Sequence, residues 1–154
     1  MRVAIASDHG GFDLARSLAT WLTGHGHLVS DFGPNPVISV DYPDYAQRVA
    51  EAIATGAADA GILVCGSGIG MSIAANKVPG IRAAVVQDVE HARLARAHND
   101  ANVLCLGGRF TSDDDGRAIV AAWLGAIYEG GRHDLRLQKI RLLEQHASAG
   151  DAEG

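Results

Sequence analysis

Two kinds of hydrophobic pattern alternate along the chain. Short apolar runs rich in β-branched residues, typical of strands, occur at 3–6, 28–33, 61–65, 81–86 and 102–107. Stretches rich in Ala and Leu with helical periodicity lie between and after them, at 11–26, 44–56, 72–77, 89–99 and 113–130. One more helical pattern follows near 133–145. The pattern predicts a β-strand and an α-helix repeated about five times, and then an extra helix.

This alternation predicts the class of fold. Strands that are apolar almost throughout are buried on both faces, and right-handed crossovers place helices on both sides of a parallel sheet. We therefore predict an α/β protein with three αβα layers, a five-stranded parallel sheet and an extra C-terminal helix. One domain should span residues 1–146, and the small, polar residues 147–154 should form a disordered tail.

Composition supports one globular domain and excludes several partners. The 154 residues are 47% hydrophobic, enough for a single core. Thirteen basic residues against 18 acidic ones give a net charge of −5, which disfavours general binding to nucleic acid or anionic membranes. We find neither a signal-peptide pattern nor an apolar stretch near the roughly 20 residues of a membrane span. The two cysteines, Cys65 and Cys105, are expected to be thiols in a reducing cytoplasm.

Candidate chemistry should lie at one edge of the predicted sheet. Ligands of open α/β sheets bind beyond the carboxyl ends of the strands, near the point where strand order reverses. The residues that follow the predicted first, third, fourth and fifth strands are therefore site candidates. These are Ser7 to Gly11, Cys65 with its glycines, Gln87 with Asp88, and Gly107 to Arg109.

The segment GILVCGSGIGMSIAANK, residues 61–77, carries the strongest local signal. Gly66, Gly68 and Gly70 allow sharp bends and leave backbone amides at the start of a helix expected from Met71, where they can cradle a phosphate or an oxyanion. A thiol at the mouth of such a cradle, Cys65, suits a base or a nucleophile. It could equally be the buried end of a strand, and the pattern alone leaves both interpretations open. Cys105 has no such glycines and is expected in the core.

Other glycine-loop motifs fit this segment poorly. A dinucleotide fingerprint follows the first strand, whereas these glycines follow the third, and only Asp88 after the next strand supports that interpretation. The hydrolase motif G-x-S-x-G fails because no glycine lies two positions before Ser67, and no G-K-[ST] sequence is present. The histidines lack the H-x-x-x-H spacing of a zinc site. We therefore expect neither a metal nor a cofactor.

Five blocks of sequence together resemble one family. They are SDHGG, VDYPDYA, CGSGIGMSIAANK followed by GIRA, ARLARAHNDANVL with LGGR, and RHDLR, and they cover nearly the whole chain in order. The chain is similar to the ribose-5-phosphate isomerase B family, which includes galactose-6-phosphate isomerase subunits. The resemblance implies a Rossmann-like fold and an aldose–ketose isomerisation of a phosphorylated sugar. Such a reaction opens the sugar ring and moves a proton through an enediolate.

The resemblance assigns the proton transfer to the glycine-rich segment. Cys65 is the implied base, Ser67 assists it through its hydroxyl, and the enediolate oxygens are held by the amides of the loop, at Gly66, Gly68, Ile69 and Gly70. The family more often has Thr where this chain has Ser67, which keeps the hydroxyl. A branch that lacks the cysteine has Glu at the position of Met71, and since methionine cannot act as a base, Cys65 is left as the candidate.

Further roles follow from the same blocks. Asp8 and His9 match substrate-contacting residues, His98 matches the residue that protonates the ring oxygen, and Asn99 matches one that holds substrate oxygens. Tyr42 is expected to line the sugar site, with loop packing as the alternative. Arg132 and Arg136 lie four residues apart and share a helix face that can grip a phosphate, with Arg109 as a further candidate. The spacing of Arg132 and Arg136 alone would favour a row of solvent-exposed basic residues on a helix. The match to the family favours a phosphate site instead.

The last predicted helix also suggests an assembly. It carries more apolar side chains than a free terminal helix should expose, at Leu135, Leu137, Ile140, Leu142 and Leu143. The resemblance implies a homodimer, or a dimer of such dimers, in which Cys65 and the first-strand loop of one chain meet His98, Asn99 and the C-terminal arginines of the other.

Two questions stay open at the level of sequence. The substrate could be ribose 5-phosphate or another aldose phosphate, such as a tetrose phosphate or the hexose galactose 6-phosphate. The chain could also be a non-catalytic module that binds phosphosugars, although such a module would have no use for a thiol at Cys65.

Overall fold

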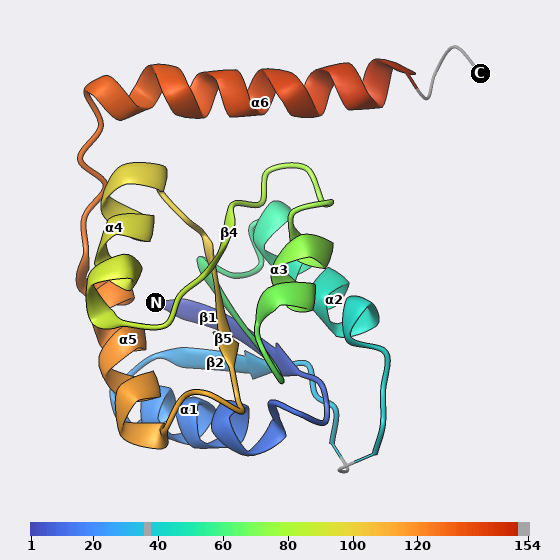
Figure 1. Cartoon of the computed structure of the whole chain (residues 1–154), viewed down its shortest axis with the longest axis vertical. Helices are drawn as coiled ribbons and strands as arrows, with labels where there is room; N and C mark the ends of the chain where they lie inside the picture. Colours follow the sequence, from blue (N-terminus) through green and yellow to red (C-terminus); the bar gives the residue numbers. More distant parts are fainter. Residues whose placement is uncertain (36–37, 151–154) are drawn as a thin grey trace.

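The computed structural model describes residues 1–35 and 38–150 and contains one parallel sheet. Its strand order is β2-β1-β3-β5-β4 (Figure 1). The strands are β1 (Arg2–Ser7), β2 (Leu28–Asp31), β3 (Ala60–Cys65), β4 (Ala83–Val85) and β5 (Val103–Gly107). Every residue of β3 and β5 is buried, as continuous apolar runs require. The predicted α/β class with five parallel strands is confirmed.

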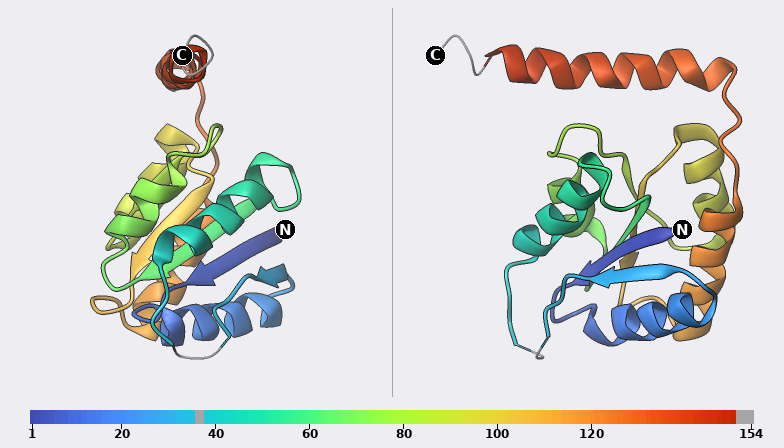
Figure 2. Two further views of the ribbon diagram at one scale, coloured as in Figure 1. Left: turned by 90° about the vertical axis from the view of Figure 1, so that its right-hand side faces the viewer. Right: turned by 180° about the vertical axis from the view of Figure 1, so that it is seen from behind.

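Helices cover both faces of the sheet, as the two views of Figure 2 show. They are α1 (Phe12–Gly24), α2 (Tyr42–Ala54), α3 (Ile69–Ala75), α4 (Val89–Asn99), α5 (Asp113–Gly125) and α6 (Arg132–Gly150). One core lies between the sheet and α1, α4 and α5, with Leu18 and Trp123 among its buried side chains. The other core lies between the sheet and α2 and α3, with Val49 and Met71.

The strand order sets the place of a ligand site. The chain passes from β1 outward to β2 and then returns to the other side of β1 for β3, so β1 and β3 are neighbours at the point where the order reverses. Ligands of such sheets bind at the carboxyl ends of the strands that flank this point. Those ends carry the segment that begins at Asp8 and the segment that begins at Cys65.

Several element boundaries differ from the predicted ones. Helix α3 begins at Ile69, before the predicted Met71, because Gly68 takes a left-handed conformation with φ of 79° and forms the N-cap. Helix α2 begins at Tyr42 because Pro43 fits the first helical turn, where a missing N–H costs nothing. Helix α5 ends at Gly125, because the backbone becomes extended at Ala126. Strand β4 is limited to Ala83–Val85.

Helix α6 crosses the amino-terminal side of the sheet, and its first turn contacts the end of α4 (Figures 1 and 2). It continues to Gly150, so residues 147–150 are helical where a disordered tail was expected, and residues 151–154 lie outside the described part of the chain. Its buried side chains, among those described, are His133 and Leu137. Leu135, Ile140, Leu142 and Leu143 are exposed. Within residues 1–35 and 38–150, no helix combines the length and apolar character needed to cross a bilayer.

Candidate active site

Three strand ends meet closely at the carboxyl edge of the sheet. A Cβ atom added to Gly108 would lie 2.5 Å from the carbonyl oxygen of Gly10, and one added to Gly10 would lie 3.1 Å from the backbone of Gly66. The amide of Gly108 also donates a hydrogen bond of 2.7 Å to the carbonyl of Cys65. Side chains at these glycines would separate the loops after β1, β3 and β5. The expected convergence of these loops is therefore present.

Cys65 ends β3 and is held by its own loop. Its side chain is buried, and its sulfur accepts a hydrogen bond of 3.1 Å from the amide of Gly68. The hydroxyl of Ser67 accepts one of 3.3 Å from the amide of Ile69. Two amides of the expected cradle thus already contact the thiol and the hydroxyl. A substrate oxygen bound to these same amides would replace those contacts.

The second cysteine has a different environment. Cys105 lies inside β5 and is fully buried, and this burial, together with the nearby Cys65, raises the pKa of its thiol. Both cysteines are free thiols. A neutral, inaccessible thiol cannot act as a base, so Cys105 is a core residue, as expected.

The loop after β1 orients its polar side chains toward the same edge. One carboxylate oxygen of Asp8 accepts hydrogen bonds from the amides of Gly10, at 2.8 Å, and Gly11, at 3.1 Å. The amide of Asp8 donates to the carbonyl of Val64 in β3, at 3.1 Å. These bonds fix the Asp8 carboxylate, whereas the side chain of His9 is exposed beside it. His9 is therefore free to meet a ligand.

Two further candidates contact the Cys65 loop. A Cβ added to Gly70 would lie 2.6 Å from Cζ of Tyr42, so the Tyr42 ring packs on the backbone in the first turn of α3. A Cβ added to Gly66 would lie 3.1 Å from Cζ of Arg109, so that guanidinium lies over the loop. Tyr42 and Arg109 are thus brought to the same edge as Cys65.

The remaining candidates lie at the opposite edge. His98 and Asn99 end α4, which runs back across the sheet and finishes beside the start of β5. Cys65 pairs with Gly107 at the other end of that strand, so the length of β5 separates the two groups, about 16 Å at 3.3 Å per residue. Within one chain, the structure does not bring His98 and Asn99 to Cys65.

His98 belongs to a small cluster that sequence reasoning missed. Its ring stacks on that of His133 with centroids 4.4 Å apart. A carboxylate oxygen of Glu129 lies 3.6 Å from Nε2 of His98 and 3.7 Å from Nε2 of His133. Burial, followed by the neighbouring His98, lowers the pKa of His133. No motif spacing links residues 98, 129 and 133, so the cluster was visible only in the fold.

The same cluster is the best candidate for a metal site among the described residues. One ligand atom from each of His98, Glu129 and His133 lies within 4.8 Å of the others. However, the two rings are stacked and nearly parallel, at 18°, so their in-plane nitrogen lone pairs lie in separate planes and are poorly placed to converge on one ion. Nε2 of His133 also lies 3.5 Å from the donor Nε of Arg132. The arrangement fits a polar cluster better than a metal centre.

The two C-terminal arginines lie near this cluster, at the start of α6. Nη1 of Arg136 donates to the carbonyl of Arg132 at 3.2 Å, as expected for residues one turn apart. Both side chains are exposed, and neither forms an ion pair with another described residue. They are free to bind an anion. Arg109 lies at the carboxyl edge, so one chain does not join it to them.

The fold is that of a Rossmann-like α/β protein, and its candidate small-ligand site lies where the strand order reverses. The chain belongs to the ribose/galactose isomerase family, whose model matches residues 3–140. It is 47% identical to ribose-5-phosphate isomerase B of Escherichia coli over 144 residues, which cover 94% of this chain and 97% of the relative. It is 45% identical to a putative sugar phosphate isomerase of Bacillus subtilis, over 94% of this chain and 98% of the relative.

Solved structures give the same result. Ribose-5-phosphate isomerase B of Clostridium thermocellum superposes with a TM-score of 0.94 at 50% identity, over 96% of this chain and 99% of that one. The enzyme of Mycoplasma genitalium with bound ribulose 5-phosphate superposes with a TM-score of 0.91 at 44% identity, over 94% and 96% of the two chains. The family resemblance found in the sequence is confirmed.

Proposed function

We propose that the protein interconverts ribose 5-phosphate and ribulose 5-phosphate through an enediolate, with Cys65 as the base. The observation that carries this proposal is the position of the Cys65 sulfur, at the end of β3 on the amide of Gly68. A residue that only ended β3 would not need a thiol at the carboxyl edge of the sheet, where ligands bind between glycine-rich loops. The naming of close relatives as ribose-5-phosphate isomerase B supports the choice of substrate.

The proposed reaction uses only groups of the protein and the sugar. The Cys65 thiolate takes the proton from C2 of the open aldose, and the electrons of that bond form the C1–C2 double bond of the enediolate as O1 becomes negative. The proton then returns to C1, the hydroxyl proton of O2 passes to O1, and the ketose carbonyl forms at C2. Ser67 assists with its hydroxyl, and the amides from Gly66 to Gly70 stabilise the negative oxygens. Asp8, His9 and Tyr42 hold the sugar.

We further propose that two chains share each site. About 16 Å of β5 lies between the Cys65 loop and the end of α4, which is too far for both to act on one five-carbon sugar. In a twofold dimer, His98 of one chain would protonate the ring oxygen of a sugar held at Cys65 of the other, Asn99 would hold its hydroxyls, and Arg132 and Arg136 would bind its phosphate.

The surface of α6 supports this assembly. Leu135 and Leu143 are 59% and 68% exposed, on a helix that also exposes Ile140 and Leu142. Apolar surface of this extent on one helix favours burial against a second copy. We propose that residues 1–146 act as one isomerase domain within this homodimer, in the cytoplasm, where both thiols stay reduced.

A coupled isomerisation assay with four-, five- and six-carbon aldose phosphates tests the substrate. Ribose 5-phosphate should give the highest kcat/KM. A higher value for a tetrose or hexose phosphate would show that the pentose assignment is wrong. Tight binding of phosphosugars without turnover of any of them would instead indicate a non-catalytic binding module.

A further inference from the structure

Helix α4 ends in an unusual residue. Asp100 follows Asn99 as the C-cap with φ of 45°, and it is the only non-glycine residue with positive φ among residues 1–35 and 38–150. A left-handed conformation costs a residue with a side chain about 1 kcal/mol or more, and glycine is the usual choice at this position. The aspartate side chain must therefore supply something that glycine would not.

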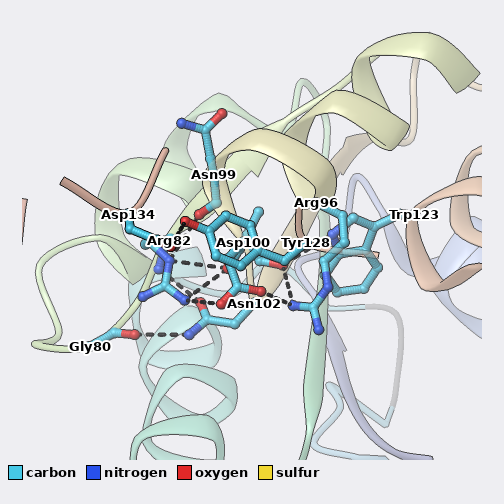
Figure 3. A network of polar contacts seen from close by, with 10 residues as sticks. Gly80, Arg82, Arg96, Asn99, Asp100, Asn102, Trp123, Tyr128 and Asp134 are labelled. Atoms are coloured by element: carbon cyan, nitrogen blue, oxygen red, sulfur yellow. Dashed lines mark hydrogen bonds and ion pairs between the residues drawn. The ribbon is translucent and has the colours of Figure 1, made fainter. Parts of the chain in front are cut away.

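The Asp100 carboxylate binds two arginines. Its Oδ2 lies 3.2 Å from Nη2 of Arg82, and its Oδ1 lies 2.9 Å from Nη1 of Arg96 (Figure 3). The Arg82 guanidinium also donates to backbone carbonyls at the end of α4. Its Nε lies 3.0 Å from the oxygens of both Asn99 and Asp100, and its Nη2 lies 2.8 Å from that of Asp100. One side chain thus satisfies carbonyls that a helix end leaves without partners.

Arg82 is itself held in place. Its amide donates to the side chain of Asn102 at 2.8 Å, and the same side chain donates to the carbonyl of Gly80 at 2.8 Å. The carbonyl of Ala101 accepts a hydrogen bond of 3.2 Å from the indole of Trp123, which is buried in the core. Figure 3 shows these residues surrounding the turn after α4. The turn is therefore fixed from the core, from the start of β4 and from the start of β5.

We propose that Arg82 is a positioning residue for ring opening, acting through the last turn of α4. It binds the backbone of Asn99 itself, and His98 is the preceding residue. The imidazole of His98 contacts Glu129 and His133, and the amide of Glu129 donates to the carbonyl of Ala97 at 2.9 Å. These contacts hold one face of the last turn of α4, whereas Arg82 binds the carbonyls at its end. This inference rests on the proposed roles of His98 and Asn99. Displacement of a catalytic group by about 1 Å can cost up to about a hundredfold in rate.

The two halves of the reaction can be measured separately. Ribose 5-phosphate is cyclic, and its isomerisation requires ring opening. Ribulose 5-phosphate is acyclic because the phosphate occupies the oxygen that would close a ring on C2. Removal of its C1 proton by Cys65 and return of a deuteron from heavy water therefore require the enediolate step and no ring opening. Both rates are compared at saturating substrate, so that weaker binding through Asn99 limits neither of them. A defect in the position of His98 should then slow isomerisation of ribose 5-phosphate and spare this exchange.

The test compares Arg82→Gln with the unaltered full-length protein in both assays. Net conversion of ribose 5-phosphate is followed by a coupled assay, and deuterium incorporation at C1 of ribulose 5-phosphate by NMR in heavy water. Conversion should fall about tenfold or more, while exchange stays within about twofold. Arg2→Gln is the matched control, because it removes an exposed arginine at the start of β1 that pairs with Asp59 at 2.7 Å. It should change neither rate.

Asp100→Gly provides a second variant that tolerates the left-handed backbone. It removes the carboxylate but keeps the carbonyls that Arg82 binds, so conversion should fall less than in Arg82→Gln, again with exchange spared. If Arg82→Gln does not fold, the ratio of the two rates in Asp100→Gly decides the question. A parallel fall in both rates, or no fall in either, would overturn the positioning role. A wild-type protein that neither converts nor exchanges its substrate would refute the proposed function itself.

Discussion

Substitution of Gly70 by alanine should separate the stability of the protein from its binding of sugar. The added Cβ would lie 2.6 Å from Cζ and 3.0 Å from the hydroxyl oxygen of Tyr42. Ordinary contact begins at 3.4 Å, so the ring must withdraw by about 0.8 Å, the difference between 3.4 and 2.6 Å. Tyr42 can move because its side chain is 39% exposed and lies at the start of α2.

Two contributions to the free energy of unfolding have opposite signs in Gly70→Ala: the helix preference of alanine is favourable, and the displacement of the Tyr42 ring is unfavourable. Gly70 lies in the first turn of α3, where alanine favours the helix over glycine by at most about 1 kcal/mol. Because the displaced ring is partly exposed, the free energy of unfolding should stay within about 1 kcal/mol of the wild-type value. Loss of one hydrogen bond from Tyr42 to the sugar costs about 1 kcal/mol, which corresponds to a rise in KM of about fivefold.

Four proteins give the measurement: wild type, Gly70→Ala, Tyr42→Ala and the double variant. Once the ring is absent, the added methyl group has nothing to displace, so Gly70→Ala should change KM little in the Tyr42→Ala background. Gly24→Ala is the control, since Gly24 also lies in a helix and an added Cβ there would meet nothing within 4 Å. An unchanged KM in both Gly70→Ala and Tyr42→Ala would show that Tyr42 does not contact the sugar. Fully additive effects in the double variant would show that Gly70→Ala acts through the backbone of its own loop and not through Tyr42.

Four further outcomes are expected. Cys65→Ala should abolish isomerisation and leave phosphosugar binding by calorimetry nearly intact, and substantial residual turnover would exclude Cys65 as the base. Arg136→Ala should raise KM with little change in kcat, because phosphate contacts alter little in the transition state; a lower kcat at constant KM would contradict this role. Cys65→Ala and His98→Ala chains should each be inactive, and re-assembly of an equal mixture should recover roughly a quarter of wild-type activity, because half of the dimers are mixed and each has one intact site of two. No recovery, once mass spectrometry has verified the mixed dimers, would place both residues in one chain's site. The pKa of His133 is lowered, so its ring stays neutral to a lower pH in the folded protein than in the unfolded chain. The free energy of unfolding should therefore fall as the pH drops from the ordinary value of 6.5 through the lower folded pKa. His133→Gln should weaken this dependence in thermal melts, and identical pH profiles of the two proteins would refute it.

The sequence was sufficient to predict the class of fold, because strands such as Ala60–Cys65 are apolar throughout and alternate regularly with helical patterns. The ends of the elements were less predictable. The early start of α3 depends on the left-handed conformation of Gly68. The sequence has glycine at three alternate positions, 66, 68 and 70, and does not show which of them takes that conformation. Similarly, the apolar period of α5 continues beyond Gly125, although the backbone turns away there.

Prediction of the candidate site was also partial. The glycine pattern located the loop of Cys65, but the pattern alone could not distinguish a base from a buried strand end. The contacts of Arg82 with Asp100, and of Glu129 with His98, join residues 18 and 31 positions apart, and only the fold brings them together. The position of His98 follows from topology, because a helix that returns across a parallel sheet ends beside the amino ends of the strands.

The placement of Cys65 and His98 at opposite edges of one sheet has a consequence for how much of the protein is active at a given concentration. A single chain carries two half-sites, and neither is complete if the site is shared. Dissociation then removes whole sites, so the fraction of active protein follows the law of mass action. Near the dissociation constant of the dimer, the rate per chain falls as the protein is diluted. Substrate that bridges the two chains opposes this loss, because it binds the assembled form alone.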